Sequence, residues 1–213
     1  MTQSKIFILS RNVDYTEFSA VSTNATLYLF SAFPAIHLVI LVVTLILSFS
    51  LTARIEKMSV ASAQMMFLVF SALMGVTAST WLYLYQLTSI VFIFLATALY
   101  FGALAAYGHF TNRSLAGYKS ILLSGLIFLI LFGVLSLFIP GMTAFDSMIS
   151  LFGIAIFLGY IAYDTQRIRE FYYYYSGYPD MMEKASIFSA LQLYMDFINL
   201  FLYLLRFLGK QRN

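Results

Sequence analysis

The sequence predicts an all-α fold, a polytopic transmembrane helix bundle, on the strength of its composition and its charge pattern. Apolar residues make up 62% of the 213 residues and charged residues only 10%, whereas a soluble domain carries about 25% charged residues. A soluble protein of this size could not bury so much apolar surface, because much of a small domain faces solvent. The few charges are separated by uncharged runs long enough for the roughly 20 residues that cross a bilayer.

Composition also excludes several classes of protein. The chain has no cysteine, which rules out disulfides, thiolate zinc sites and a cysteine nucleophile. The net charge of +3 comes from 12 basic and 9 acidic residues, too small an excess for a nucleic-acid surface, so no nucleic-acid partner is expected. Two isolated histidines do not make a metal site. We therefore expect no resident cofactor and a lipid bilayer as the main partner.

Seven helices in one transmembrane domain, residues 1–213, are expected, and turn signals separate them. Pro34 opens the second helix at a first-turn position, where a missing N–H does no harm. The aromatic residues around Trp81 mark a membrane interface between the third and fourth helices, and Pro140 stops the fifth helix. The expected helices are 15–33, 35–53, 61–84, 89–107, 115–139, 147–164 and 186–208.

The first of these helices has the composition least typical of a membrane span. Residues 15–33 are long enough to span but are rich in Ser, Thr and Asn, and Asp14 and Glu17 lie at their start. Small polar residues suit close packing against other helices. The alternative interpretation is an arm that lies at the membrane interface.

Basic residues predict the orientation, because cytoplasmic connections carry an excess of Lys and Arg. They follow the second, fourth and sixth expected helices, which places those three connections in the cytoplasm. The orientation of the last helix then has two alternatives. A spanning helix would put its basic tail outside the cytoplasm, and a re-entrant helix would keep the tail inside. The basic residues at the three connections are Arg54, Lys57, Arg113, Lys119, Arg167 and Arg169, and those of the tail are Lys210 and Arg212.

Two aspartates are the candidate functional residues. Asp196 lies in the middle of the last apolar run, and Asp164 ends the run before it. Consecutive helices are often neighbours, so the two carboxyls can meet, and Asn199 on the same helical face could donate to Asp196. Two close carboxyls in a low dielectric do not both ionise easily and share a proton. Such a pair could be a pH sensor, a proton site or a cation site.

Two structural alternatives stand beside this functional interpretation. Asp164 could be a hydrated residue at the membrane edge near Arg167. Asp196 could hold helices together through hydrogen bonds, although ionisable residues within the membrane most often mark functional sites.

Two segments, Ala162-Tyr-Asp-Thr-Gln-Arg-Ile168 and the terminal stretch 190–209, resemble the Bax inhibitor-1 family, most closely its bacterial branch. The resemblance covers residues 35–209. It implies seven helices with the last one central, and a calcium leak controlled by pH through an aspartate pair that falls on Asp164 and Asp196, where calcium could bind in transit. The sequence departs from the family at Thr44, where many members carry a glutamate, and in its eroded first helix.

The leading functional hypothesis is therefore a pH-sensitive calcium or cation leak in the cytoplasmic membrane of a bacterium. Arg54, at the cytoplasmic end of the second helix, is the expected counter-charge of the pair. The alternative is a regulatory protein that binds a membrane protease or a stress factor and conducts no ions. No enzymatic activity is expected, because intramembrane aspartyl proteases carry Gly-x-Gly-Asp where this chain has Leu193-Tyr-Met-Asp196.

Overall fold

A computed structural model describes residues 39–40, 42–44, 46–47, 50, 57–136, 138–139 and 141–212. Five helices of this part of the chain are long and apolar enough to cross a membrane, which confirms the all-α transmembrane bundle. They are α4 (Val60–Leu84), α5 (Leu87–Phe110), α6 (Lys119–Ser136), α7 (Asp146–Tyr175) and α8 (Pro179–Leu208), with short 3-10 turns η1 (Ala116–Tyr118) and η2 (Met142–Phe145). The expected helix 15–33 lies outside the described residues, as does most of 35–53, whose described positions from 39 to 50 are helical.

The bounds of the last two helices differ from those expected from hydropathy. α7 does not end at Asp164 but continues to Tyr175, and α8 begins at Pro179 rather than at residue 186. Charged residues mark the edge of the membrane and do not end a helix, whereas the chain turns only where Gly177 and Pro179 interrupt it. Each helix has 30 residues and is about 45 Å long, longer than the hydrocarbon core.

The connection between α5 and α6 also differs from the expectation. α6 is shorter than the expected 115–139, because η1 occupies its first turn and the helix ends at Ser136. α5 is longer than expected at both ends.

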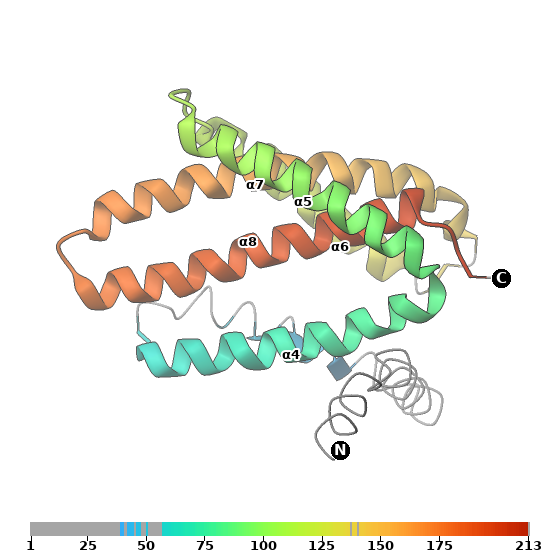
Figure 1. Cartoon of the computed structure of the whole chain (residues 1–213), viewed down its shortest axis with the longest axis horizontal. Helices are drawn as coiled ribbons and strands as arrows, with labels where there is room; N and C mark the ends of the chain where they lie inside the picture. The colour runs from blue at the N-terminus through green and yellow to red at the C-terminus, as the bar shows by residue number, and fades with distance from the viewer. Residues whose placement is uncertain are drawn as a thin grey trace, which may run out of the picture.

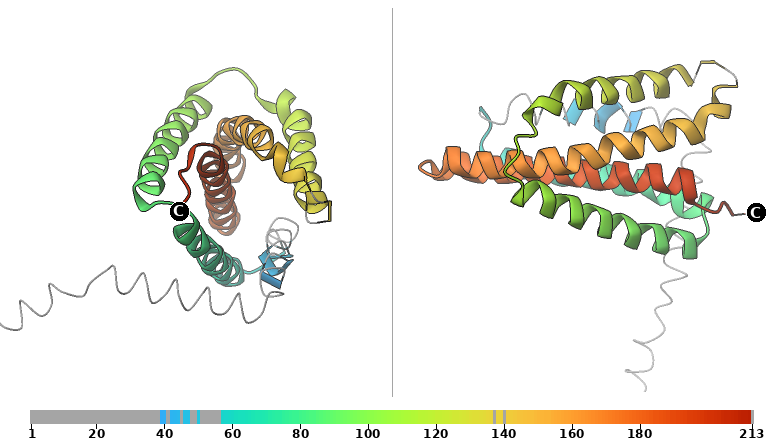
Figure 2. Two further views of the ribbon diagram at one scale, coloured as in Figure 1. Left: turned by 90° about the vertical axis from the view of Figure 1, so that its right-hand side faces the viewer. Right: turned by 90° about the horizontal axis from the view of Figure 1, so that it is seen from above.

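The C-terminal helix is central, as the resemblance implied. α8 packs against α4, α5 and α7, and α7 in turn packs against α5, α6 and α8. Seen end-on, α8 lies within the ring formed by the other helices (Figure 2). Ile161 of α7 and Leu200 and Leu205 of α8 are fully buried between them, so the core of the bundle follows the α7–α8 hairpin (Figure 1).

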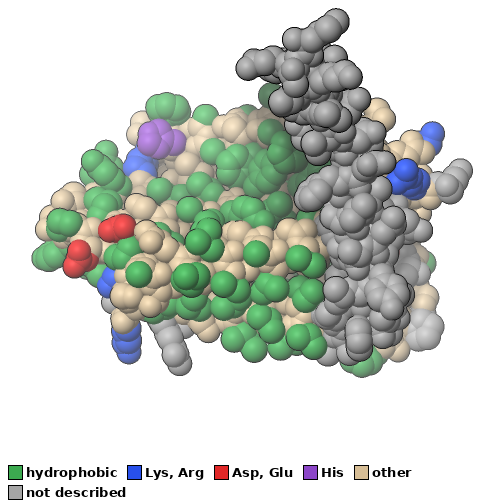
Figure 3. All heavy atoms as spheres, turned by 60° about the horizontal axis from the view of Figure 1, so that its bottom comes forward, with side chains coloured by type: hydrophobic (Ala, Val, Ile, Leu, Met, Phe, Trp, Pro, Cys, Tyr) green, Lys and Arg blue, Asp and Glu red, His purple; other side chains and the backbone are tan. Residues whose placement is uncertain are grey.

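The outer surface of the bundle is apolar. Large hydrophobic side chains such as Leu99, Ile121 and Leu131 are more than half exposed. On the face drawn in Figure 3, hydrophobic side chains occupy the middle, and charged side chains gather toward the two ends of the described region. A bilayer solvates such a band, because lipid tails are as apolar as the side chains.

The C-terminal tail returns to the turn between α4 and α5. Gln211 forms an isolated bridge with Tyr85, and the backbone N–H of Gln86 donates to the carbonyl of Lys210 at 3.0 Å. α8 therefore runs through the bundle without re-entering, and the tail lies at the end opposite to the α5–α6 connection (Figure 1). Of the two alternatives left by the sequence, the structure supports the spanning helix.

Candidate functional site

The α7–α8 hairpin brings Asp164 and Asp196 together inside the bundle. The two residues are only 4% and 5% exposed, and their carboxyl groups lie within hydrogen-bonding range of each other. Because α7 continues past Asp164, the residue lies within a helix, where it faces α8. This burial contradicts the alternative in which Asp164 is a hydrated residue at the membrane edge.

A hydrogen bond between two carboxyl groups requires a proton on one of them, because an ionised carboxylate only accepts. A hydrogen-bonded pair of carboxyls therefore carries one shared proton. The second oxygen of Asp196, Oδ2, is buried and has no hydrogen-bond partner among the described residues. A buried, unpartnered carboxyl oxygen is costly, and it is available to a proton donor or a cation.

The groups around the pair are an aromatic hydroxyl and a cation. Tyr160, one turn before Asp164, lies near enough to both carboxyls to interact with them electrostatically. Arg167 lies on the other side, near Asp164, and its guanidinium carbon is 4.9 Å from the centre of the Phe171 ring. The pair is thus placed between the apolar interior and a basic group toward the end of α7.

The supporting residues expected from the sequence have other partners. Asn199 donates its side-chain N–H to the carbonyl of Met195 at 2.8 Å and forms no hydrogen bond with Asp196 in the described part of the chain, so the expected donation to Asp196 is wrong. Thr44 donates to the carbonyl of Ile40, one turn before it, at 2.7 Å. In both cases the helix backbone is the nearest acceptor. Arg54, the expected counter-charge, lies outside the described residues.

Sequence reasoning missed two polar residues beside the aspartates. Gln192 precedes Asp196 by one turn of α8, and its side-chain oxygen is buried without a partner in the described part of the chain. Tyr160 likewise precedes Asp164 by one turn, on α7. The spacing of four residues, which places side chains on one helical face, was the signal that could have found both.

The described residues supply few ligands for a resident metal ion. They contain no group of three or more His, Cys, Asp or Glu side chains that could hold one. Calcium takes six to eight oxygen ligands, more than the carboxyl pair and the Gln192 oxygen can offer. The described side chains near the pair therefore fall short of a full calcium coordination sphere.

A bundle of membrane-spanning helices with a buried carboxyl pair against its central helix defines a multi-pass membrane protein with an ionisable interior. The chain matches the family described as inhibitor of apoptosis-promoting Bax1 over residues 15–213. It belongs to the Bax inhibitor-1 family.

Bacterial relatives support this assignment. An uncharacterized protein of Rickettsia prowazekii is 41% identical over 157 residues, which cover 74% of this chain and 66% of the relative. The inner membrane protein YbhL of Escherichia coli is 36% identical over 174 residues, 81% of this chain and 74% of that protein. An uncharacterized membrane protein of Streptococcus pyogenes is 34% identical over 178 residues, 83% and 76% of the two chains. The matched chain thus spans two thirds to three quarters of these relatives.

Proposed function

We propose that this protein is a pH-sensitive cation leak, with calcium as the conducted ion, and that Asp164 and Asp196 control it. The observation that carries the proposal is the buried carboxyl pair, which lies against the central helix and leaves Oδ2 of Asp196 without a partner. Ionisable residues at membrane depth most often mark ion or proton pathways. The proposal assigns no catalytic reaction to the pair.

The pair can control conduction because its two protonation states differ in what they need from their surroundings. With one proton shared, the carboxyls bond to each other and carry a single negative charge. With both ionised, they repel each other across a low dielectric and need a cation between them or a nearby guanidinium. Arg54 remains the proposed competitor for the ionised pair, on the evidence of its sequence position alone.

The proposed location is the bacterial cytoplasmic membrane. The E. coli relative is an inner membrane protein by name. The connections at one end of the bundle carry Lys57, Arg113 and Lys119, which favours this end as the cytoplasmic one. The C-terminal tail would then lie outside the cytoplasm.

Calcium flux into liposomes that contain the purified protein tests the proposal. Wild type should conduct, with a flux that changes between about pH 5 and 8, the range in which a shared proton is exchanged. Asp164→Asn and Asp196→Asn should each remove this dependence. Asp180→Asn is the matched control, since Asp180 is an exposed aspartate in the first turn of the same α8. Equal flux at every pH for wild type and both pair variants would refute control by the pair, and flux no greater than in empty liposomes would refute the leak.

A second candidate function is that of a regulator that binds another membrane protein, such as a protease. The observation that favours it is a group of tyrosines at the α7–α8 hairpin, which are 61 to 76% exposed. Exposed tyrosines are common in protein interfaces. The members of the group are Tyr172, Tyr173, Tyr174 and Tyr178. Co-purification of one defined membrane protein that is lost on replacing these tyrosines by serine, together with an absence of calcium flux, would favour this function.

A further inference from the structure

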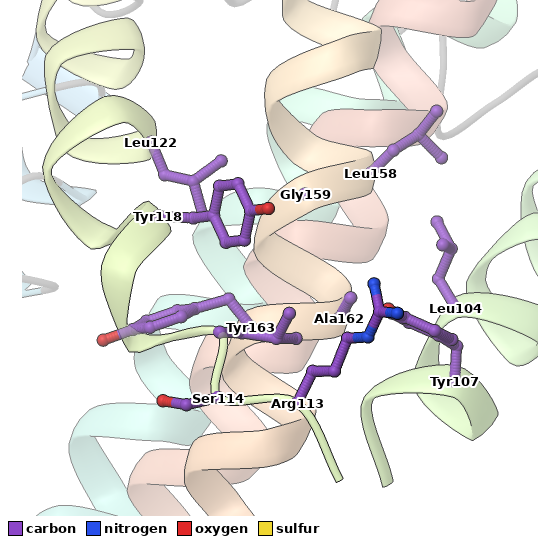
Figure 4. A pocket seen from close by; sticks show the side chains of 11 residues that line it. Leu104, Tyr107, Arg113, Ser114, Tyr118, Leu122, Leu158, Gly159, Ala162 and Tyr163 are labelled. Carbon is purple, nitrogen blue, oxygen red and sulfur yellow. The ribbon is translucent and has the colours of Figure 1, made fainter. Parts of the chain in front are cut away.

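A cavity of about 450 Å³ lies between α5, α6 and α7, at the end of the bundle that carries the α5–α6 connection. α7 forms its floor with Leu158, Gly159 and Ala162. Leu104 of α5 and Leu122 of α6 face it from the two sides (Figure 4). Its interior is mostly apolar, and Asp164 is not part of its lining.

The cavity exists because α5 and α6 both pack on α7 but make little contact with each other. Figure 2 shows the two helices on either side of α7, joined by a long connection that passes over the gap. Small residues hold each helix against α7, since Gly108 of α5 abuts Ala162 and Gly159 of α7 abuts Leu122. The result is a cleft with a fixed floor.

The cleft is open at the side of the bundle. Tyr107 and Tyr118, which flank it, are 51% and 58% exposed. The part of such a cleft that opens toward the hydrocarbon core is filled by lipid, because no water is available in that core. The three leucines of its walls and floor offer the apolar contact that an acyl chain needs.

The mouth of the cleft carries one charge, the guanidinium of Arg113. Gln166 of α7 fixes the backbone that follows this arginine: its oxygen accepts from the N–H of Leu115 at 2.7 Å and its N–H donates to the carbonyl of Arg113 at 2.9 Å. The guanidinium of Arg169, a second cation near this connection, donates to the carbonyls of His109 and Thr111 and therefore already has hydrogen-bond partners. Figure 4 shows the Arg113 side chain directed along α7 toward Tyr107.

The guanidinium of Arg113 is free to bind an anion. No carboxylate lines the cleft, and no hydrogen bond or ion pair joins this guanidinium to another described side chain. Arginine binds phosphate oxygens in pairs, with a geometry that a lysine lacks. Ser114 and Tyr118 also line the cleft, and their hydroxyls are hydrogen-bond donors.

We propose that this cleft binds one anionic phospholipid, with its phosphate on Arg113 and an acyl chain along Leu104, Leu122 and Leu158. The position of the charge supports an anionic lipid, because α5 ends at Phe110 and Arg113 follows it by three residues, where lipid headgroups lie. The proposal is independent of ion conduction. Through Arg113, the α5–α6 connection binds a lipid headgroup, whether or not the protein conducts ions.

Native mass spectrometry of the purified protein, titrated with phosphatidylglycerol and phosphatidylcholine of the same acyl chains, tests the site. Wild type should retain phosphatidylglycerol in preference to phosphatidylcholine. Arg113→Gln should weaken phosphatidylglycerol retention about fivefold, the effect of one basic residue on an anionic lipid. Arg113→Lys should retain part of the preference. Lys119→Gln is the matched control, since Lys119 is a nearby exposed cation that does not line the cleft, and it should behave as wild type.

Two further arms separate the lipid from a soluble anion and test the acyl-chain wall. Glycerol phosphate, which has the headgroup chemistry without acyl chains, should not displace the bound lipid at millimolar concentration. Leu158→Trp, which fills the cleft, should reduce retention of phosphatidylglycerol. The site is refuted if wild type binds both lipids equally, if Arg113→Gln keeps the wild-type preference, or if glycerol phosphate displaces the lipid. The wild-type arms decide the question even where a variant does not fold.

Discussion

Gly108 of α5 lies against the backbone of Ala162 of α7, so closely that a methyl group at position 108 would overlap the Ala162 carbonyl. This contact is two residues from Asp164, and α7 makes it with the face that does not meet α8. It fixes the distance between α5 and α7 at the level of the aspartate pair. The contact is therefore a point at which the bundle can be tested without changing an ionisable group.

Gly108→Ala should destabilise the bundle, because the clash is with backbone and cannot be relieved by a side-chain rotation. Overpacking of this kind costs about 1–3 kcal/mol. Gly102→Ala, in the same helix, is the control: nothing lies within 4 Å of a methyl group there, and alanine favours helix by up to about 1 kcal/mol. Thermal unfolding in detergent should show a lower Tm for the first variant only. Equal Tm values would show that α5 is free to move away from α7.

Asp196→Leu should leave an assembled protein, since an apolar residue of similar volume often replaces a buried charge without loss of stability. Asp196→Lys should assemble poorly, because the longer side chain overpacks the closely packed core beside Asp164. Size-exclusion chromatography after detergent extraction measures both. If the leucine variant aggregates as much as the lysine variant, Asp196 serves to hold the helices together.

The calcium leak should be greater at higher pH. Lower pH supplies the shared proton, and the hydrogen-bonded pair leaves less charge to attract a cation. Higher pH removes that proton, and the doubly ionised pair draws in a cation or a guanidinium. A liposome flux assay across pH 5 to 8 should show this sign for wild type and for Asp180→Asn. A flux that rises as the pH falls would reverse the assignment of the conducting state.

Thr44→Glu should raise calcium flux, because it would add a third acid, besides Asp164 and Asp196, to the proposed ion pathway. The Thr44 hydroxyl is uncharged and donates to its own helix backbone. Thr44→Gln is the control, with the same shape and no charge. A glutamine variant that conducts as well as the glutamate variant would mean that side-chain length, and not charge, limits the flux.

The C-terminal tail should be accessible to a water-soluble reagent from the same side of the membrane as the α4–α5 turn. The chain has no cysteine, so single cysteines report accessibility without background. Gln211→Cys and Thr88→Cys should be labelled by a membrane-impermeant maleimide from one side of the membrane, and Ser176→Cys, at the end of α7, from the other. Labelling of Gln211→Cys and Ser176→Cys from the same side would contradict the spanning α8.

Particular elements show where sequence reasoning succeeded and where it stopped. The third and fourth expected helices closely match α4 and α5, because long apolar runs bounded by turn residues have few alternatives in a membrane. Hydropathy placed the C-terminal end of α7 too early and the N-terminal end of α8 too late. The charged turns from Asp164 to Tyr175 and from Pro179 to Ser186 are helical although they extend beyond the apolar core. The partner of Asn199 could not be predicted, because its own helix offers a closer acceptor.

The sequence by itself determined that the protein is a multi-pass membrane protein with two aspartates on consecutive helices. Composition and spacing suffice for this, because each span must satisfy its backbone hydrogen bonds within itself. The family rests on a different signal, the resemblance carried by residues 162–168 and 190–209. Only the tertiary structure decided which face of α7 meets α8, that α8 ends beside Tyr85, and that α5 and α6 leave a cleft over α7. The physical reason is that lipid and protein interior are equally apolar, so hydropathy does not distinguish the face of a helix that packs from the face that lipid covers.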